Sequence, residues 1–138
     1  MTLKQELIDA YLDADYVVFT DPELVLKIGE PSARLDALLE QAGAAGAAFV
    51  SAANPRGERR DDAENAAAAS ALDDLVAASG YPRHPGEGRD PHGRWRAEPS
   101  LLVLGIYRDN AEALGRIFGQ NAIVFVEKGR PPELVLLT

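Results

Sequence analysis

Hydrophobic positions near the start of the chain change from helical to strand-like spacing. Apolar or aromatic residues at positions 3, 7, 8, 11 and 12 fall on one helical face, which predicts a short amphipathic helix over 3–12. The β-branched and aromatic segments 16–19 and 24–28 are separated by the turn residues Thr20-Asp21-Pro22. This pattern predicts two short strands that pair as a hairpin.

Capping residues predict the next two helices. Ser32 is expected to cap a helix that Gly43 ends, because a left-handed residue commonly closes a helix. The apolar segment 47–53 follows it and predicts a third strand. Asp61 and Glu64 have the spacing of a capping box, in which each side chain accepts a hydrogen bond from a free backbone N–H. They predict the start of the long alanine-rich helix.

The second half of the chain contains the most apolar segments. Residues 101–106 are hydrophobic without alternation, which is typical of a strand buried on both faces, so we expect this strand at the centre of the sheet. Asp109 or Asn110 is expected to cap the helix that follows. Segments 122–126 and 133–137 predict the last two strands.

The order of these elements indicates the fold class. Strands and helices interleave without strict alternation, which predicts one α+β domain over 1–138, a mixed β-sheet with helices packed on it. The segment 81–99 contains four prolines and three glycines, and we expect a long irregular loop there. Loops of that length in a compact domain are usually functional or disordered.

Composition excludes several classes of function. The chain has no cysteine, so disulfides, thiolate catalysis and cysteine zinc sites are absent. The formal net charge of −8 argues against nucleic acid or an anionic membrane as the partner. The start of the chain has no signal-peptide pattern, and no apolar segment is long enough to cross a membrane, so we expect a cytoplasmic protein.

Arginine residues are concentrated in two connecting segments of an otherwise acidic chain. A guanidinium group presents a planar set of donors that suits phosphate or carboxylate, which favours a small anionic ligand. Alternatively, these arginines neutralise neighbouring carboxylates on a solvated surface, where ion pairs contribute little. The first segment contains Arg56, Arg59 and Arg60, and the second Arg83, Arg89, Arg94 and Arg96.

Known motifs do not assign a chemistry. Gly86-Glu87-Gly88 resembles part of a phosphate loop but does not lie between a strand and a helix, so a turn is expected. His84 and His92 are the only histidines, and we expect neither a metal site nor a bound cofactor. Trp95 has two interpretations, an anchor packed on the core or a stacking platform for a ligand.

The expected topology brings polar residues to one edge of the sheet. Because a helix joins strands 101–106 and 122–126, we expect them to be a parallel pair whose amino ends meet at one edge. If strand 47–53 is antiparallel to them, its end reaches the same edge. Alternatively, the amides there bond loop backbone and the carboxylate neutralises an arginine. The candidate rim consists of Asn54, Arg56, Arg89, Glu98, Ser100 and Gln120.

Five stretches resemble a bacterial family known as domain of unknown function 3293. Members of the family tend to read Thr-Ala-Trp-Asn-Pro before the long helix, where this chain has Ser51 and Ala53 in place of the threonine and tryptophan. The resemblance supports the order of the motifs and implies no particular reaction. The stretches are Phe49-Val50-Ser51-Ala52-Ala53-Asn54-Pro55, Asp62-Ala63-Glu64-Asn65, Pro85-Gly86-Glu87-Gly88-Arg89-Asp90-Pro91, Trp95-Arg96-Ala97-Glu98-Pro99-Ser100 and Phe118-Gly119-Gln120-Asn121-Ala122.

Two functions are compatible with these observations. In the first, the rim binds a small anionic molecule or an acidic peptide, with Arg56 and Arg89 holding the anion and Asn54 and Gln120 orienting it. If the protein is an enzyme, Glu98 is the candidate general acid or base, because burial raises the pKa of a carboxyl group. In the second, the protein is a non-catalytic module for protein–protein interaction. RNA binding is a weaker third hypothesis.

Overall fold

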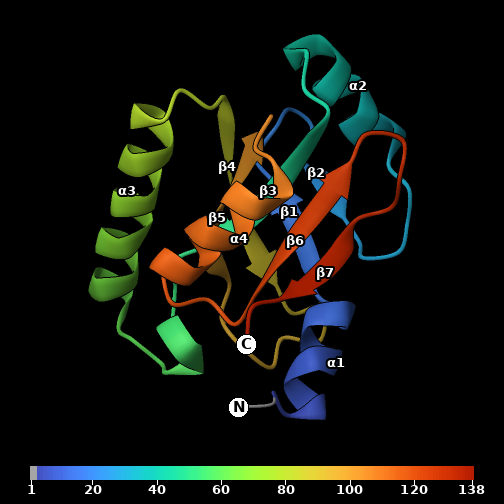
Figure 1. The fold of residues 1–138 in the computed structure, drawn as a ribbon. Helices are drawn as coiled ribbons and strands as arrows, with labels where there is room; N and C mark the ends of the chain where they lie inside the picture. The colour runs from blue at the N-terminus through green and yellow to red at the C-terminus, as the bar shows by residue number, and fades with distance from the viewer. Residues whose placement is uncertain (1–2) are drawn as a thin grey trace.

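An antiparallel β-sheet organises the chain in the computed structural model, which describes residues 3–138 (Figure 1). Its strands are β1 (Asp15–Val18), β2 (Leu24–Leu26), β3 (Gly46–Ser51), β4 (Arg83–Arg89), β5 (Glu98–Leu104), β6 (Ala122–Glu127) and β7 (Glu133–Leu136). Within residues 3–138 the order is β2-β1-β4-β5-β3-β6-β7, and each of these neighbouring pairs is antiparallel. The α+β class is therefore confirmed, but the sheet is antiparallel where we expected a mixed one.

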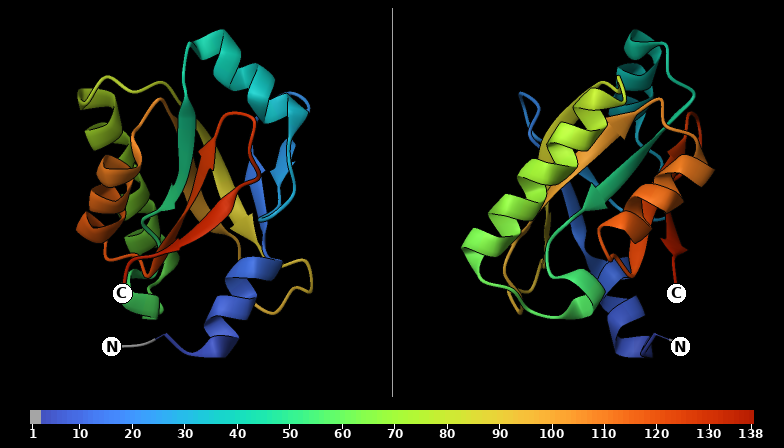
Figure 2. Two further views of the ribbon diagram at one scale, coloured as in Figure 1. Left: turned by 45° about the vertical axis from the view of Figure 1, so that its right-hand side comes forward. Right: turned by 60° about the vertical axis from the view of Figure 1, so that its left-hand side comes forward.

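Helices cover both faces of the sheet. The helices are α1 (Gln5–Asp13), α2 (Ala33–Ala42), α3 (Asp62–Ala78) and α4 (Arg108–Ile117), with a 3₁₀ turn, η1, at Pro55–Gly57. α3 and α4 lie side by side on one face, and α2 packs on the other (Figure 2). The alternation along β3 explains this arrangement, since Ala47 and Phe49 join the core under α2 whereas Ala48 and Val50 join the core under α3 and α4.

The local signals in the sequence act as expected in most elements. Ser32 accepts a hydrogen bond from the backbone N–H of Leu35, and Gly43 closes α2 with φ 65°. Asp61 and Glu64 form the predicted capping box of α3. α4 differs, because it begins at Arg108 with Tyr107 at the capping position and not at Asp109 or Asn110. The predicted hairpin is present as β1 and β2.

The expected loop over 81–99 is wrong in its first half, where β4 pairs with β1 on one side and β5 on the other. Gly86 permits this pairing, because a Cβ atom there would lie 2.1 Å from the carbonyl oxygen of Val17. Pro85 has no N–H to donate, but its carbonyl accepts a hydrogen bond from the N–H of Phe19 at 2.9 Å.

The relation between β5 and β6 also differs from the expectation. The two strands run in the same direction, but β3 lies between them and is antiparallel to both. β5 is the central strand of the sheet, as the uniformly apolar segment indicated. The amino ends of β5 and β6 and the carboxyl end of β3 consequently meet at one end of the sheet, which is the convergence the sequence predicts.

None of the helices between residues 3 and 138 has the length and apolar character needed to cross a membrane.

Candidate functional site

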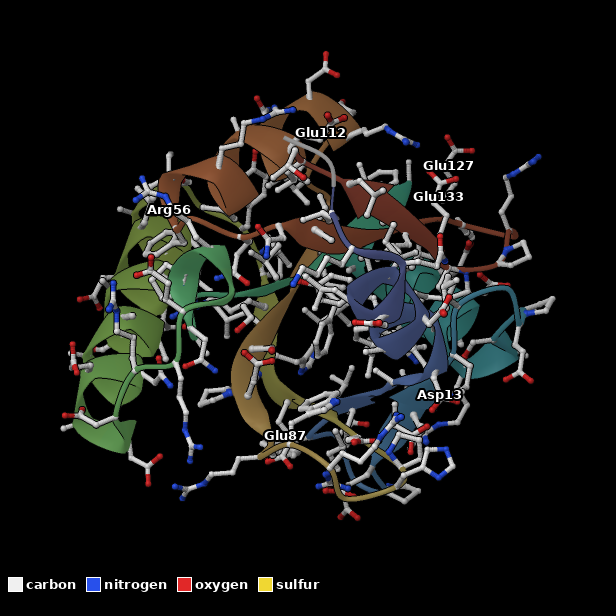
Figure 3. The ribbon with its side chains drawn as sticks, turned by 90° about the horizontal axis from the view of Figure 1, so that it is seen from below. Asp13, Arg56, Glu87, Glu112, Glu127 and Glu133 are labelled. Atoms are coloured by element: carbon white, nitrogen blue, oxygen red, sulfur yellow. The ribbon has the colours of Figure 1, made fainter. Side chains whose placement is uncertain are left out.

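A pocket lies at the end of the sheet where β3 ends and where β5 and β6 begin. Its volume is about 290 Å³. Helix α1 lies across this end of the sheet (Figures 1 and 3). The lining consists of Leu7, Ala10, Tyr11, Ala14, Tyr16, Phe49, Ser51, Ala53, Asn54, Gly57, Gly88, Trp95, Glu98, Ser100, Gln120, Asn121, Ala122, Ile123, Val124 and Leu134. The volume is near the lower end of the range for small-molecule sites.

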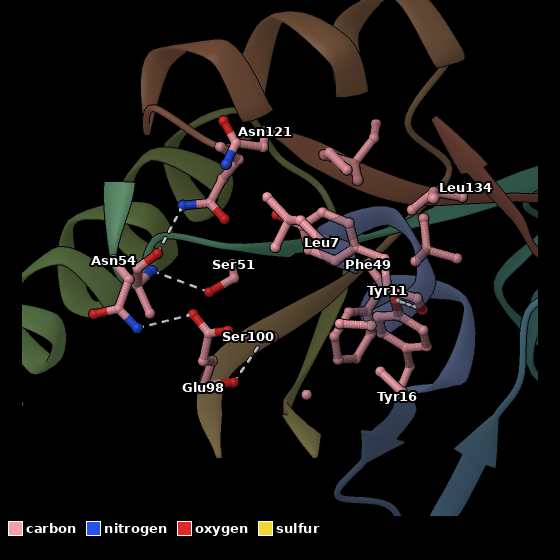
Figure 4. A pocket seen from close by; sticks show the side chains of 18 of the residues that line it. Leu7, Tyr11, Tyr16, Phe49, Ser51, Asn54, Glu98, Ser100, Asn121 and Leu134 are labelled. Atoms are coloured by element: carbon pink, nitrogen blue, oxygen red, sulfur yellow. Dashed lines mark hydrogen bonds between the residues drawn. The ribbon is translucent and has the colours of Figure 1, made fainter. Parts of the chain in front are cut away.

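Glu98 is held by an amide network that reaches to α3. Its Oε2 accepts a hydrogen bond from Nδ2 of Asn54 at 3.1 Å (Figure 4). Asn54 is fixed in turn by Asn65, whose Nδ2 donates to Asn54 Oδ1 at 3.0 Å and whose Oδ1 accepts from the Asn54 backbone N–H at 3.0 Å. Asn54 Oδ1 also accepts from the backbone N–H of Arg60 at 2.9 Å. The Asn54 side chain thus has one defined orientation toward Glu98.

The backbone around this network adopts unusual conformations. Asn54 and Arg56 have left-handed φ values of 47° and 59°, a region that residues other than glycine rarely adopt. Asparagine tolerates this region better than most residues, whereas arginine does so at a cost. The bonds from Asn65 hold Asn54 there, and the Arg56 N–H donates to the Gly119 carbonyl at 2.7 Å. Local backbone strain of this kind is concentrated at functional sites.

Burial raises the pKa of the Glu98 carboxyl above its usual range, and the hydrogen bond from Asn54 opposes this shift. The direction agrees with the sequence-based expectation for a carboxyl at this edge of the sheet. Near neutral pH, Glu98 is therefore protonated to a larger extent than an ordinary surface glutamate. A raised pKa of this kind is typical of carboxyl groups that exchange a proton with a ligand.

The shifted pKa of Glu98 predicts a pH-dependent effect of Glu98→Gln on stability. Because the pKa is higher in the folded state than in the unfolded state, the stabilising contribution of Glu98 is present below the unfolded value of about 4.3 and is lost as pH rises through the folded value. We therefore expect Glu98→Gln to gain stability relative to the original protein as pH rises from about 4 to 8. Urea unfolding at several pH values measures this difference.

Glu6→Gln, at an exposed position on α1, controls for the general loss of one negative charge in this experiment. A constant difference between Glu98→Gln and the original protein across the pH range would contradict the assigned shift.

Aromatic side chains form the apolar side of the pocket. Tyr16 and Phe49 meet edge to face, with ring centroids 5.3 Å apart and an interplanar angle of 78°. The Tyr16 hydroxyl donates to the backbone carbonyl of Tyr11 and thereby ties β1 to α1. Burial raises the pKa of both tyrosines, so their hydroxyl groups remain neutral near pH 7. Tyr11, Tyr16 and Phe49 lie together, across the pocket from Asn54 and Glu98 (Figure 4).

The remaining polar residues of the predicted rim bond mainly to backbone. Gln120 Nε2 donates to the Ala53 carbonyl at 3.0 Å, which is the structural alternative considered for this amide. The Ser100 hydroxyl donates to the Glu98 carbonyl at 3.0 Å. These bonds brace the strand ends that form the pocket, and both side chains line it.

Four of the six predicted rim residues meet at the pocket, but the two arginines do not. Arg56, which is part of η1, lines a separate depression with Arg116 and Phe118. Arg89 is held by Glu87 at 2.6 Å and by Glu23 at 3.4 Å. The strand ends converge as predicted, and β4 ends at this same end of the sheet, where Gly88 pairs with Glu98. Because side chains alternate along a strand, Gly88 lines the pocket whereas Arg89 is on the opposite face with Glu87.

A wider groove continues outward from the pocket and contains other arginines of the two segments. It shares Asn54, Gly57, Trp95 and Glu98 with the pocket and adds Arg59, Arg60, Arg94 and Arg96. Arg60 pairs with Glu58, Arg94 with Asp90 and Asp13, and Arg96 with Asp62. Neutralisation by nearby carboxylates, one of the two sequence interpretations, therefore describes most of these side chains.

The histidines lie outside the pocket. His84 is in β4, and His92 lies 3.1 Å from Asp13. Within residues 3–138, no three histidine, aspartate or glutamate side chains come together as ligands for a metal ion.

Sequence reasoning missed Asn65 and Tyr11 as parts of the site. Asn65 lies on the first turns of α3 and reaches back to Asn54, a contact that only the packing of α3 creates. Tyr11 is on the predicted apolar face of the first helix, and residues of that face line the pocket. Asn65 ends one of the stretches that resemble the family, which is the one sequence signal for it.

The fold and the site define a small antiparallel α+β protein with a ligand-sized pocket at the end of its sheet. The family model described as "Protein of unknown function (DUF3293)" matches residues 50–123, over half of the chain, and the chain belongs to this family. The matched segment contains Asn54, Asn65, Glu98 and Gln120, whereas α1 precedes it. Searches of the curated proteins and of the solved structures found no match.

Proposed function

We propose that this protein binds a small molecule in the pocket at the end of the sheet. The observation that carries the proposal is a carboxyl group, Glu98, held by Asn54 on one side of a concave, mostly apolar cavity. Few but oriented polar groups in an apolar cavity are typical of ligand sites. Glu98 and its amide network would fix the polar end of the ligand, and the aromatic side would receive an apolar body.

The same geometry allows proton transfer. A carboxyl whose pKa is raised toward neutrality serves as a general acid or base, and a hydrogen bond from Asn54 orients it. If the bound molecule is turned over, Glu98 is the residue that would donate or accept the proton. Asn54 would act as a positioning residue in that reaction.

The concave shape of the pocket favours a small molecule over a protein as the binding partner. The exposed large hydrophobic residues between positions 3 and 138 come from different parts of the chain; they are Leu12, Phe19, Val25, Leu75, Tyr107, Ile117 and Leu136. Isolated exposed hydrophobic residues are normal on monomeric proteins and do not indicate an interface.

A thermal-shift screen against a library of small polar and aromatic compounds tests the proposal. A ligand at about 100 times its dissociation constant should stabilise the native state by about 2.7 kcal/mol and raise the melting temperature. We expect the hits to lose this effect in Ala10→Phe, which places a ring in the pocket from α1. Hits should keep it in Arg89→Ala, a change outside the pocket.

Two results would contradict the proposal. Hits that stabilise Ala10→Phe as much as the original protein bind elsewhere on the surface. The absence of hits over a broad library, with both variants folded, would show that the pocket does not select a small molecule.

A further inference from the structure

The pocket contains a negatively charged residue and no positively charged one, although many arginines lie near it. Among the lining residues within 3–138, Glu98 is the one that carries a formal charge, and the others are apolar, aromatic, amide or hydroxyl side chains or glycine. The hydrogen-bond partner of its carboxylate is the neutral amide of Asn54. An ionised carboxylate taken partly out of water without a cationic partner is unfavourable. A positively charged ligand would offset this cost.

The other side of the pocket is suited to a cation as well. The aromatic side chains of Tyr11, Tyr16 and Phe49 lie there, and Trp95 also lines the pocket. The faces of aromatic rings attract cations, and cages of aromatic rings are used to bind ammonium ligands. The edge-to-face contact with Phe49 and the hydrogen bond to the Tyr11 backbone carbonyl hold the Tyr16 ring in place.

We infer that the ligand of this pocket is a small organic cation, an ammonium or amidinium group on an apolar body, whose charge pairs with the Glu98 carboxylate beside the aromatic side chains. The inference rests on the proposed function and specifies its ligand class. The net charge of −8 supports it, because an acidic protein attracts small cations to its surface.

An anion fits the same pocket poorly. It would face Glu98, and the guanidinium groups expected to hold it lie elsewhere, with Arg56 lining a separate depression and Arg89 paired with Glu87. The groove outside the pocket is where an anionic substituent of a larger ligand would meet Arg59, whose side chain has no ion pair among residues 3–138. The pocket itself therefore offers an anion no cationic side chain with which to pair.

Pairing with a cation requires the ionised form of Glu98. Because burial raises the pKa of this carboxyl in the empty pocket, cation binding releases a proton at lower pH, and affinity should rise with pH and then level off. A neutral ligand of the same shape should lack this dependence. The other titratable or charged side chains that line the pocket and the groove around Glu98 are Tyr11, Tyr16, Arg59, Arg60, Asp61, Asp62, Arg94 and Arg96.

Matched probes of equal shape test the inference by ¹H–¹⁵N NMR titration. Benzylamine, benzyl alcohol and benzoate share one ring and differ in charge. Two further series keep the amine, alcohol and carboxylate groups and replace the benzyl group with a cyclohexylmethyl or a butyl group. At pH 8 we expect the ammonium to bind at least about tenfold more tightly than the alcohol, with benzoate weakest. The ammonium affinity should increase between pH 5 and 8.

Two variants separate charge pairing from general binding. In Glu98→Gln the preference for ammonium over alcohol should fall toward one. Trp95→Leu removes a half-buried loop ring and should weaken the ammonium by about fivefold with less effect on the alcohol. Trp95→Leu keeps the test decisive if Glu98→Gln does not fold, and the NMR spectrum of each variant reports folding.

The outcomes distinguish the two proposals. If the alcohol binds as tightly as the ammonium, or benzoate binds best, the cation inference is wrong and the proposed function stands. The same conclusion follows if no ammonium probe binds while the library screen yields neutral or anionic pocket ligands. If neither the probes nor the screen yield a pocket ligand, both proposals fail.

Discussion

Gly86→Ala is expected to lower the free energy of unfolding by about 3 kcal/mol and the melting temperature by about 10 °C. Gly86 is buried in β4 between β1 and β5. A methyl group there would lie 2.1 Å from the Val17 carbonyl oxygen and 3.3 Å from the Phe49 ring. Because the nearest obstacle is backbone, a side-chain rotation cannot relieve the clash, and β4 must separate from β1. Urea unfolding followed by far-UV circular dichroism measures the loss.

Gly88→Ala is the matched control for this prediction. It lies two residues further along β4, and the nearest atom to an added Cβ is in the Trp95 side chain at 4.0 Å, an ordinary contact. We expect a change of less than about 1 kcal/mol. Equal effects of the two substitutions would show that close approach of β1 and β4 is not what requires a glycine at position 86.

Asn65→Ala is expected to lower the free energy of unfolding by about 2 kcal/mol. The substitution removes the acceptor for the Asn54 backbone N–H and the donor to Asn54 Oδ1. An unsatisfied, partly buried N–H costs about 1–3 kcal/mol, and the better helix propensity of alanine returns part of it. The left-handed backbone of Asn54 also loses the contacts that hold it. Chemical unfolding again provides the measurement.

Asn65→Asp separates the two hydrogen bonds of Asn65. Its carboxylate can accept from the Asn54 N–H but cannot donate to Asn54 Oδ1, so an intermediate loss of about 1 kcal/mol is expected. Asn65 does not line the pocket, but Asn54 orients Glu98. Asn65→Ala should therefore also weaken the binding of benzylamine. Stability equal to that of the original protein in Asn65→Ala would show that the network does not hold Asn54.

Elements with strong local signals were predictable from the sequence. The apolar segment at the centre of the sheet, the capping box of Asp61 and Glu64, and the closure of α2 by Gly43 each depend on residues close in sequence. β4 was not predictable, because its proline and two glycines have low strand propensity. It becomes a strand because β1 and β5 supply its partners on both sides.

The site was predictable only where strand ends define it. Asn54, Glu98, Ser100 and Gln120 follow from the direction of β3, β5 and β6, which the topology argument obtained correctly. The positions of Arg56 and Arg89 did not follow, since loop backbone and ion pairs decide where a long side chain lies. The anion hypothesis depended on those two residues, and the pocket contains neither.

The sequence by itself determined the fold class, most helices and strands, the family, and the edge of the sheet at which polar residues gather. These properties depend on hydrophobic periodicity and capping, which are interactions between residues near one another in the chain. Only the tertiary structure decided which residues close the pocket. α1 brings Tyr11 over it from 87 positions before Glu98, and α3 brings Asn65 against Asn54. Such contacts arise from packing between elements, which no local pattern encodes, and they determine the charge of the ligand that the pocket favours.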